Sequence, residues 1–95
     1  MLNPEDPLVR MAVFGKQVED FVNSDIGRFI TRRADEEVTD CLAQLKTISP
    51  AMPWGRRKIA RLQNQIATAE RVIHWLAEAI HEGHQAMNVI EDKHE

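Results

Sequence analysis

The chain has 95 residues, of which 43% are apolar and 28% charged, and its formal net charge is −3. This length and composition predict one small folded domain, residues 1–95, and exclude disordered and fibrous chains. The N-terminus lacks the cations and apolar run of a signal peptide, and no stretch reaches the roughly 18 apolar residues of a membrane span, so we expect an intracellular protein without a membrane partner.

A first helix is predicted over residues 7–22. Asp6 followed by Pro7 is typical of a helix start, because aspartate caps free backbone N–H groups and proline lacks only a donor that is unpaired there. Apolar residues then recur at spacings of three and four, which indicates one helical face. That face contains Leu8, Met11, Gly15, Val18 and Val22.

A second helix is predicted over residues 25–48, and Ser49-Pro50 ends it, because the residue before proline avoids the α conformation. Its apolar series is Ile30, Ala34, Val38, Cys41, Leu45 and Ile48. The faces of the two helices are out of phase, which favours a break at residues 23–27, with Ser24 as N-cap and Gly27 as a weak helix former. Extending the face of the first helix straight forward would place Arg32, Glu36 and Thr39 in the seam. The alternative to a break is one continuous helix whose apolar stripe winds around it.

A third, long helix is predicted over residues 54–92. Its apolar residues keep strict 3–4 spacing for more than four heptads, as in coiled coils. The series is Ile59, Leu62, Ile66, Ala69, Ile73, Leu76, Ile80, Gly83, Met87 and Ile90. The chain is therefore predicted to be all-α: an elongated antiparallel hairpin of the second and third helices, with an additional N-terminal helix.

The C-terminal half of the third helix carries a second apolar stripe, interrupted by Glu82. Its members are Val72, Trp75, Ala79, Ala86 and Val89. One neighbouring helix cannot bury both stripes, so these residues are predicted to form an association face in a homo-oligomeric helical bundle or toward a partner protein. The alternative is a monomer in which the first helix covers everything.

Charge is distributed unevenly along the chain. Residues 1–40 and 70–95 each have a net charge of −4, whereas residues 41–69 contain no acid and have a net charge of +5. Several of these cations occupy the first turns of the third helix, where the helix dipole favours acids by about 0.3–1 kcal/mol each. We therefore predict a partner-binding basic corner for a nucleic acid or an acidic protein surface, unless these charges face acids of another subunit or serve solubility. The corner contains Trp54, Arg56, Arg57, Lys58 and Arg61.

No constellation for catalysis, a cofactor or a metal is recognisable, so we predict a protein that is not an enzyme. The single cysteine, Cys41, is expected to be a small buried apolar residue. Glu78 and His81 have the Glu-x-x-His spacing of di-metal bundles, but they fall on outer positions, where we expect solvent. His74 and His84 add only a weak surface ligand set. The phenylalanines are expected to pack in the core, and they are Phe14, Phe21 and Phe29.

The segments DPLVRMAVFGKQVEDFVNSDIGRFI and RLQNQIATAERVIHWLAEAIHEG give the chain a pattern that resembles small uncharacterised helical proteins of tailed bacteriophages and prophages. Those proteins are encoded near DNA-packaging and head genes. The resemblance implies protein–protein association in virion assembly or DNA packaging, in the bacterial cytoplasm or the virion. Two other hypotheses remain open: a nucleic-acid-binding accessory factor using the basic corner, and a phage-encoded inhibitor of a host protein.

Overall fold

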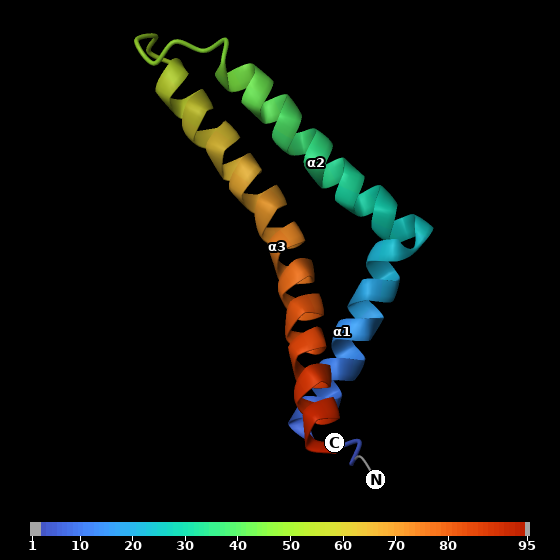
Figure 1. Ribbon diagram of the computed structural model, residues 1–95. Helices are drawn as coiled ribbons and strands as arrows, with labels where there is room; N and C mark the ends of the chain where they lie inside the picture. The colour runs from blue at the N-terminus through green and yellow to red at the C-terminus, as the bar shows by residue number, and fades with distance from the viewer. Residues whose placement is uncertain (1–2, 95) are drawn as a thin grey trace. The chain divides into compact units, whose positions relative to one another are not determined.

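The computed structural model describes residues 3–94 and contains three helices (Figure 1). These are α1 (Pro7–Asn23), α2 (Asp25–Leu45) and α3 (Gly55–His94). The described residues contain no strand, so the all-α prediction is confirmed. At 1.5 Å per residue, the 40 residues of α3 extend about 60 Å.

The predicted start of α1 is confirmed. The backbone N–H of Leu8 donates to Asp6 Oδ1 at 2.9 Å, and Pro7 occupies the first helical position. The aspartate therefore satisfies one of the amide groups that lack a partner within the helix.

The break between α1 and α2 is also confirmed and is centred on Ser24. The amide of Ser24 donates to the carbonyl of Phe21 at 3.0 Å and closes α1. Its hydroxyl oxygen accepts from the amide of Gly27 at 3.1 Å and caps α2. Gly27 has a different role from the one predicted, because a Cβ at this position would overlap the carbonyl oxygen of Phe21. Glycine is present because the chain passes close to itself there.

The end of α2 lies three residues before the predicted position, at Leu45 instead of residue 48. The amide of Thr47 donates to the Gln44 carbonyl at 3.0 Å, and the amide of Ile48 to the Leu45 carbonyl at 3.4 Å. The Thr47 hydroxyl also donates to the Gln44 carbonyl, at 2.8 Å. These i to i+3 bonds tighten the last turn and end the α-helix before Ser49-Pro50 is reached.

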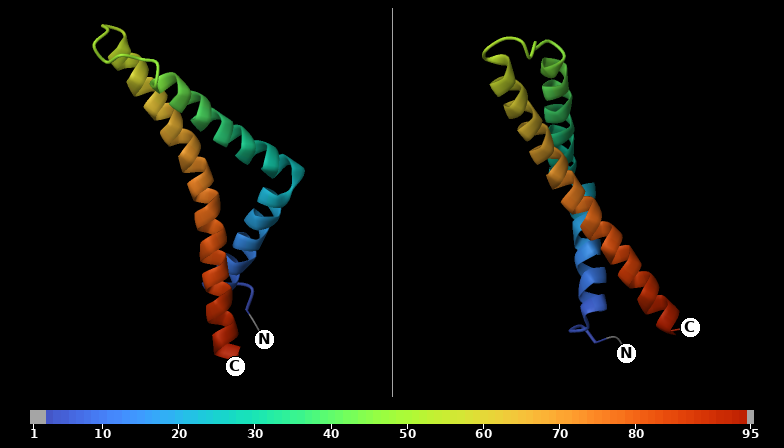
Figure 2. Two further views of the ribbon diagram at one scale, coloured as in Figure 1. Left: turned by 45° about the horizontal axis from the view of Figure 1, so that its top comes forward. Right: turned by 90° about the vertical axis from the view of Figure 1, so that its left-hand side faces the viewer.

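Contacts group the chain into two compact units, and α3 contributes to both. Unit 1 contains α1, the start of α2 up to Arg28, and α3 from His74. Unit 2 is Phe29–Ile73, in which α2 and the N-terminal half of α3 form the predicted antiparallel hairpin (Figures 1 and 2).

In unit 1, α1 and α3 cross with their backbones close together (Figure 2). A Cβ built on Gly15 would lie 2.6 Å from Gly83 Cα and 2.9 Å from the Ala79 carbonyl oxygen. Among the described residues of this unit, the buried apolar side chains are those of Ala86 and Ile90. The helices therefore pack through glycine and alanine, which allow the closest approach of two backbones.

In unit 2, the buried apolar residues are Cys41 of α2 and Leu62 of α3, as the two predicted series require. The α3 series is wrong at one position in unit 1: Met87 is 47% exposed, and Ala86, assigned to the second stripe, is buried instead. In unit 1, α1 packs against α3 at Ala79 and Gly83. Ala86 and Ile90 continue that side of the helix at spacings of three and four residues, whereas Met87 points away from it.

Candidate interaction surfaces

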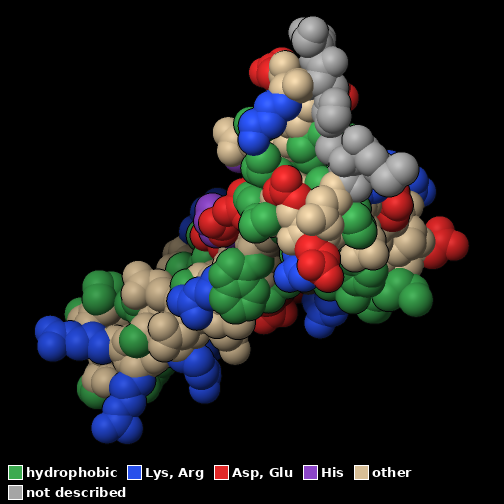
Figure 3. Space-filling model, turned by 90° about the horizontal axis from the view of Figure 1, so that it is seen from below, with side chains coloured by type: hydrophobic (Ala, Val, Ile, Leu, Met, Phe, Trp, Pro, Cys, Tyr) green, Lys and Arg blue, Asp and Glu red, His purple; other side chains and the backbone are tan. Residues whose placement is uncertain are grey.

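Large apolar side chains remain exposed on both units. Figure 3 shows hydrophobic side chains at the surface on one face of the molecule. In the part of the chain that the structure describes, thirteen such residues are exposed, whereas the buried core contains four apolar residues. All three phenylalanines are among them: Phe14 and Phe29 are 58% and 57% exposed, and Phe21 is 39% exposed. The prediction that they pack in the core is therefore wrong. Large contiguous patches of exposed apolar surface are typical of sites that contact another protein, a membrane or a ligand.

The basic corner begins at Trp54, whose carbonyl accepts the first α3 bond from the Lys58 amide at 3.2 Å. Trp54 is 52% exposed. It lines a surface hollow of about 360 Å³ together with Arg57, Lys58 and Arg61, so the structure brings four of the five predicted residues together. Arg56 is exposed but does not line this hollow.

A second concavity, not foreseen from the sequence, lies between α2 and α3 within unit 2. Its volume is about 570 Å³. Apolar side chains from both helices line it, and they are Phe29, Ile30, Ala34, Ala69 and Val72. Polar side chains complete the lining, and they are Arg33, Glu37, Arg61, Asn64, Gln65 and Thr68. We call this concavity the α2–α3 groove. The adjacent apolar pair Phe29-Ile30, which widens the apolar stripe of α2, is the sequence signal that points to it.

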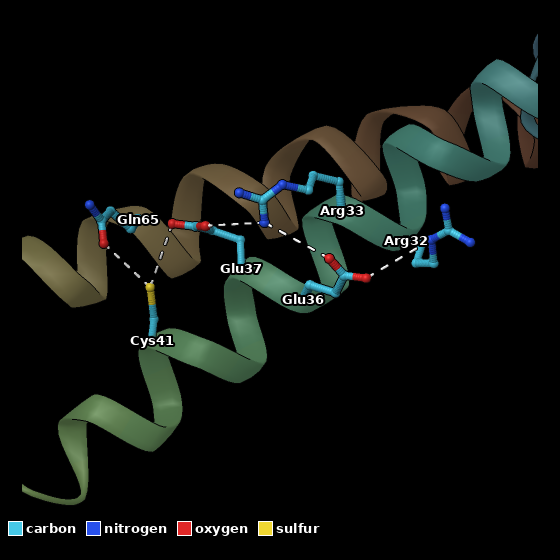
Figure 4. A network of polar contacts seen from close by, with 6 residues as sticks. All are labelled: Arg32, Arg33, Glu36, Glu37, Cys41 and Gln65. Atoms are coloured by element: carbon cyan, nitrogen blue, oxygen red, sulfur yellow. Dashed lines mark hydrogen bonds and ion pairs between the residues drawn. The ribbon is translucent and has the colours of Figure 1, made fainter.

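Ion pairs follow α2 along one side of the groove (Figure 4). The Arg33 guanidinium lies 3.9 Å from carboxylate oxygens of both Glu36 and Glu37, and Arg32 lies 3.9 Å from Glu36. Their side chains are 39–71% exposed, so each pair contributes little to stability. These ion pairs hold the arginine and glutamate side chains along the surface of α2 and add little to the free energy of unfolding.

Cys41 follows Glu37 by one turn of α2 and is buried, as predicted (Figure 4). Its thiol donates to Gln65 Oε1 at 3.3 Å and lies 3.8 Å from Glu37 Oε1. Burial, followed by the charge of Glu37, raises the pKa of the Cys41 thiol above its ordinary value. The thiol is therefore protonated at neutral pH and lacks the thiolate character that a nucleophile needs.

The five residues of the predicted association face differ in accessibility. Trp75 and Val89 are 59% and 40% exposed. Val72 is half-buried and lines the α2–α3 groove. Ala79 is half-buried beside Gly15, and Ala86 is only 2% exposed. An association face on α3 must therefore depend on residues other than these two alanines.

The histidines and acids considered as metal ligands lie apart or in pairs. His74 Nε2 is 3.6 Å from the Glu78 carboxylate, and His81 is exposed. His84 Nε2 is 2.9 Å from Glu19 Oε2 and joins α3 to α1 within unit 1. Among residues 3–94, no group of three or more His, Cys, Asp or Glu side chains is arranged to hold a metal ion.

Two further observations bear on the class of protein. No helix within the described residues combines the length and apolar character needed to cross a membrane. Comparison of the chain with protein-family models, curated proteins and solved structures finds no match. The class that the fold defines is an all-α helical protein with extensive exposed apolar surface.

Proposed function

We propose that this chain is a non-enzymatic helical protein that works by associating with other protein chains in phage particle assembly or DNA packaging. The observation that carries the association is the exposed apolar surface, with thirteen large apolar residues exposed among those described. Eight of these residues belong to α1 and α2 and three to α3, which supports contacts through all three helices. The phage context is supported by the sequence resemblance alone.

Sedimentation velocity from low to high micromolar concentration tests the association. We expect a concentration-dependent increase in sedimentation coefficient. Mass spectrometry of purified particles of the phage or prophage that encodes the chain tests the context, and we expect the chain in stoichiometric amounts or in packaging intermediates. A strict monomer that is absent from particles and from packaging intermediates contradicts the proposal.

The hollow of the basic corner favours a second candidate function, the binding of single-stranded nucleic acid. Arg57, Lys58 and Arg61 supply three cations for phosphates, and Trp54 supplies a ring on which a base can stack. The net charge of −3 opposes binding along the rest of the chain, so contact is confined to the corner.

Titration of a labelled oligonucleotide at several salt concentrations tests this second function. Binding should weaken steeply with salt, and Arg57→Glu should reduce both affinity and salt slope. Arg71→Glu makes the same charge change outside the hollow and should reduce binding much less. Quenching of Trp54 fluorescence, measured in a Trp75→Phe background, reports stacking. Absence of binding at about 50 mM salt, where phosphate contacts are strong, rejects this function.

A further inference from the structure

The α2–α3 groove and the hollow of the basic corner adjoin each other within unit 2. Every residue that lines either of them belongs to Phe29–Ile73. Arg61 lines both, so the two concavities meet at this side chain. From Arg57 in the hollow to Val72, the last α3 residue of the groove, α3 extends about 22 Å at 1.5 Å per residue. We call the two concavities together the hairpin surface.

One end of the hairpin surface is apolar. On α2, Phe29 is 57% exposed and Ile30 is 38% exposed, and half-buried Ala34 follows one turn later. In the antiparallel hairpin, the start of α2 faces the later turns of α3, which contribute half-buried Ala69 and Val72 to the same groove. These five side chains expose apolar atoms, so covering them with an apolar partner is favourable.

The other end of the hairpin surface is cationic. Arg57, Lys58 and Arg61 line the hollow, and among residues 3–94 no acid forms an ion pair with any of them. Arg33 of the groove, by contrast, is paired with acids of its own helix. The cations available to a partner are therefore gathered beside Trp54, at the start of α3.

We infer that the hairpin surface binds an amphipathic helix of a partner protein, with its apolar face over the groove and acidic residues over the hollow. The walls of the groove are two antiparallel helices, and a third helix laid along them covers both walls at once. A length of about 22 Å corresponds to about four turns of such a helix.

Charge gives the bound helix a direction. The C-terminal end of a helix carries free carbonyl groups and the negative end of the helix dipole. This end, together with acids in its last turns, is complementary to Arg57, Lys58 and Arg61. The partner helix therefore lies antiparallel to α3, and its earlier turns supply the apolar residues for the groove.

This inference rests on the proposed function, because it names the chemistry of one partner for the association. A nucleic acid is a poorer match to the whole hairpin surface. It can use the cations and Trp54, but its phosphates leave the apolar end of the groove uncovered. An amphipathic helix uses both ends.

Binding of synthetic helical peptides to the full chain tests the inference. The acidic peptide has about 18 residues, with leucines at i, i+3, i+4 and i+7 and glutamates in its last two turns. A neutral peptide has glutamines in place of these glutamates, and a serine peptide has serines in place of the leucines. Fluorescence anisotropy of the labelled peptides measures the dissociation constants.

The acidic peptide should bind at least about tenfold more tightly than the neutral peptide at low salt, because its acids face the cations of the hollow. Added salt should narrow this difference, since it screens exposed charges. The serine peptide should not bind, because it cannot cover the apolar end of the groove.

Two pairs of protein variants locate the contact. Phe29→Ala should weaken binding of the acidic peptide at least about fivefold, because aromatic side chains dominate interfaces of this kind. Phe14→Ala removes the same atoms from an equally exposed ring that does not line the groove, and it should change binding less than about twofold. Circular dichroism checks that every variant retains its helices.

Arg61→Glu should weaken binding of the acidic peptide at least about tenfold but affect the neutral peptide less than about threefold, because the neutral peptide has no acid to lose its partner. Arg71→Glu makes the same charge change at an exposed residue that lines neither concavity. It should change binding of either peptide less than about threefold.

The outcomes separate this inference from the proposed function. The inference is wrong if no peptide binds, if the acidic and neutral peptides bind equally, or if Phe29→Ala and Phe14→Ala have equal effects. If no peptide binds but Phe29→Ala abolishes a self-association seen in sedimentation, a second copy occupies the groove, and the proposed function stands without this partner. If an oligonucleotide binds and the acidic peptide does not, the hollow serves nucleic acid instead. If the peptides behave as expected but the chain is absent from phage particles and packaging intermediates, the helix-binding surface stands and the phage context is wrong.

Discussion

The two units of this chain join helices in different ways. In unit 1, α1 crosses α3 at Gly15 and Gly83 with backbone against backbone, and Ala86 completes the contact. In unit 2, side chains such as Leu62 separate α2 from α3, and a groove of about 570 Å³ opens beside them. Small residues thus bring the two helix backbones together at the unit 1 crossing, whereas larger ones leave a concave apolar surface on unit 2.

This difference teaches where a partner can bind. Added atoms have no space at the unit 1 crossing, because the nearest neighbours of Gly15 are backbone atoms that cannot move aside. The groove of unit 2 has apolar walls with space between them. Truncating a buried side chain should therefore lower the free energy of unfolding most in unit 2. Enlarging a residue at the helix crossing should lower it most in unit 1.

The largest expected effect is that of Leu62→Ala in unit 2. Leu62 is 3% exposed, and truncating a buried leucine costs about 2–5 kcal/mol in the free energy of unfolding. Urea denaturation measures the loss, and hydrogen exchange should accelerate more in α2 than in α1. Leu42→Ala removes the same atoms from a side chain that is 48% exposed, and it should cost less than about 1 kcal/mol. Equal losses for the two variants would show that Leu62 is not a core residue.

Gly15→Ala should destabilise the protein by about 1–3 kcal/mol through overpacking at the unit 1 crossing. Helix propensity alone predicts the opposite effect, a gain of about 1 kcal/mol in the free energy of unfolding. The sign of the measured change therefore shows whether overpacking or helix propensity dominates. Ala69→Val adds more volume in the groove of unit 2, where there is space, and should change stability by less than about 1 kcal/mol. A stabilised Gly15→Ala variant in urea denaturation would contradict the close crossing.

The helices could be predicted because their limits depend on local chemistry. Asp6-Pro7 and Ser24 supply hydrogen bonds within three residues of themselves, and Ser49-Pro50 excludes the helix from the residue before proline. The end of α2 was predicted three residues late, because the apolar spacing continues to Ile48 while the backbone has already tightened at Thr47.

Burial could not be predicted equally well, because it depends on which helix lies against which face. Phe14 and Phe29 have apolar neighbours in sequence, yet α3 covers other faces of their helices and leaves both exposed. The choice of Ala86 over Met87 depends on the close approach of α1 at Ala79 and Gly83, which selects the side of α3 that is buried. Four residues of the basic corner are brought together because they are adjacent along one helix. The groove was missed because it depends on the spacing between two helices.

Ser24→Ala should cost about 1 kcal/mol, a smaller effect at the junction of α1 and α2. It removes the oxygen that accepts from the Gly27 amide and leaves the first turn of α2 without its cap. Ser24→Asp retains an acceptor and should stay within about 0.5 kcal/mol of the wild type. Thermal denaturation followed by circular dichroism compares the two. The capping role is rejected if the alanine and aspartate variants have the same stability.

The smallest expected effect is an alkaline loss of stability that originates in unit 2. Burial and the Glu37 charge raise the pKa of Cys41 above its ordinary value of 9.0. Above pH 9 the unfolded chain therefore releases a thiol proton that the folded chain still holds, so stability should begin to fall there and continue until the folded thiol ionises. The Asp20 carboxylate raises the pKa of Lys16 in unit 1 above 10.5, which gives a loss of the same sign only at higher pH. Urea denaturation at a series of pH values should show the earlier decline in the wild type and not in Cys41→Ala. A decline between pH 9 and 10 that persists in Cys41→Ala would assign it to a group other than this thiol.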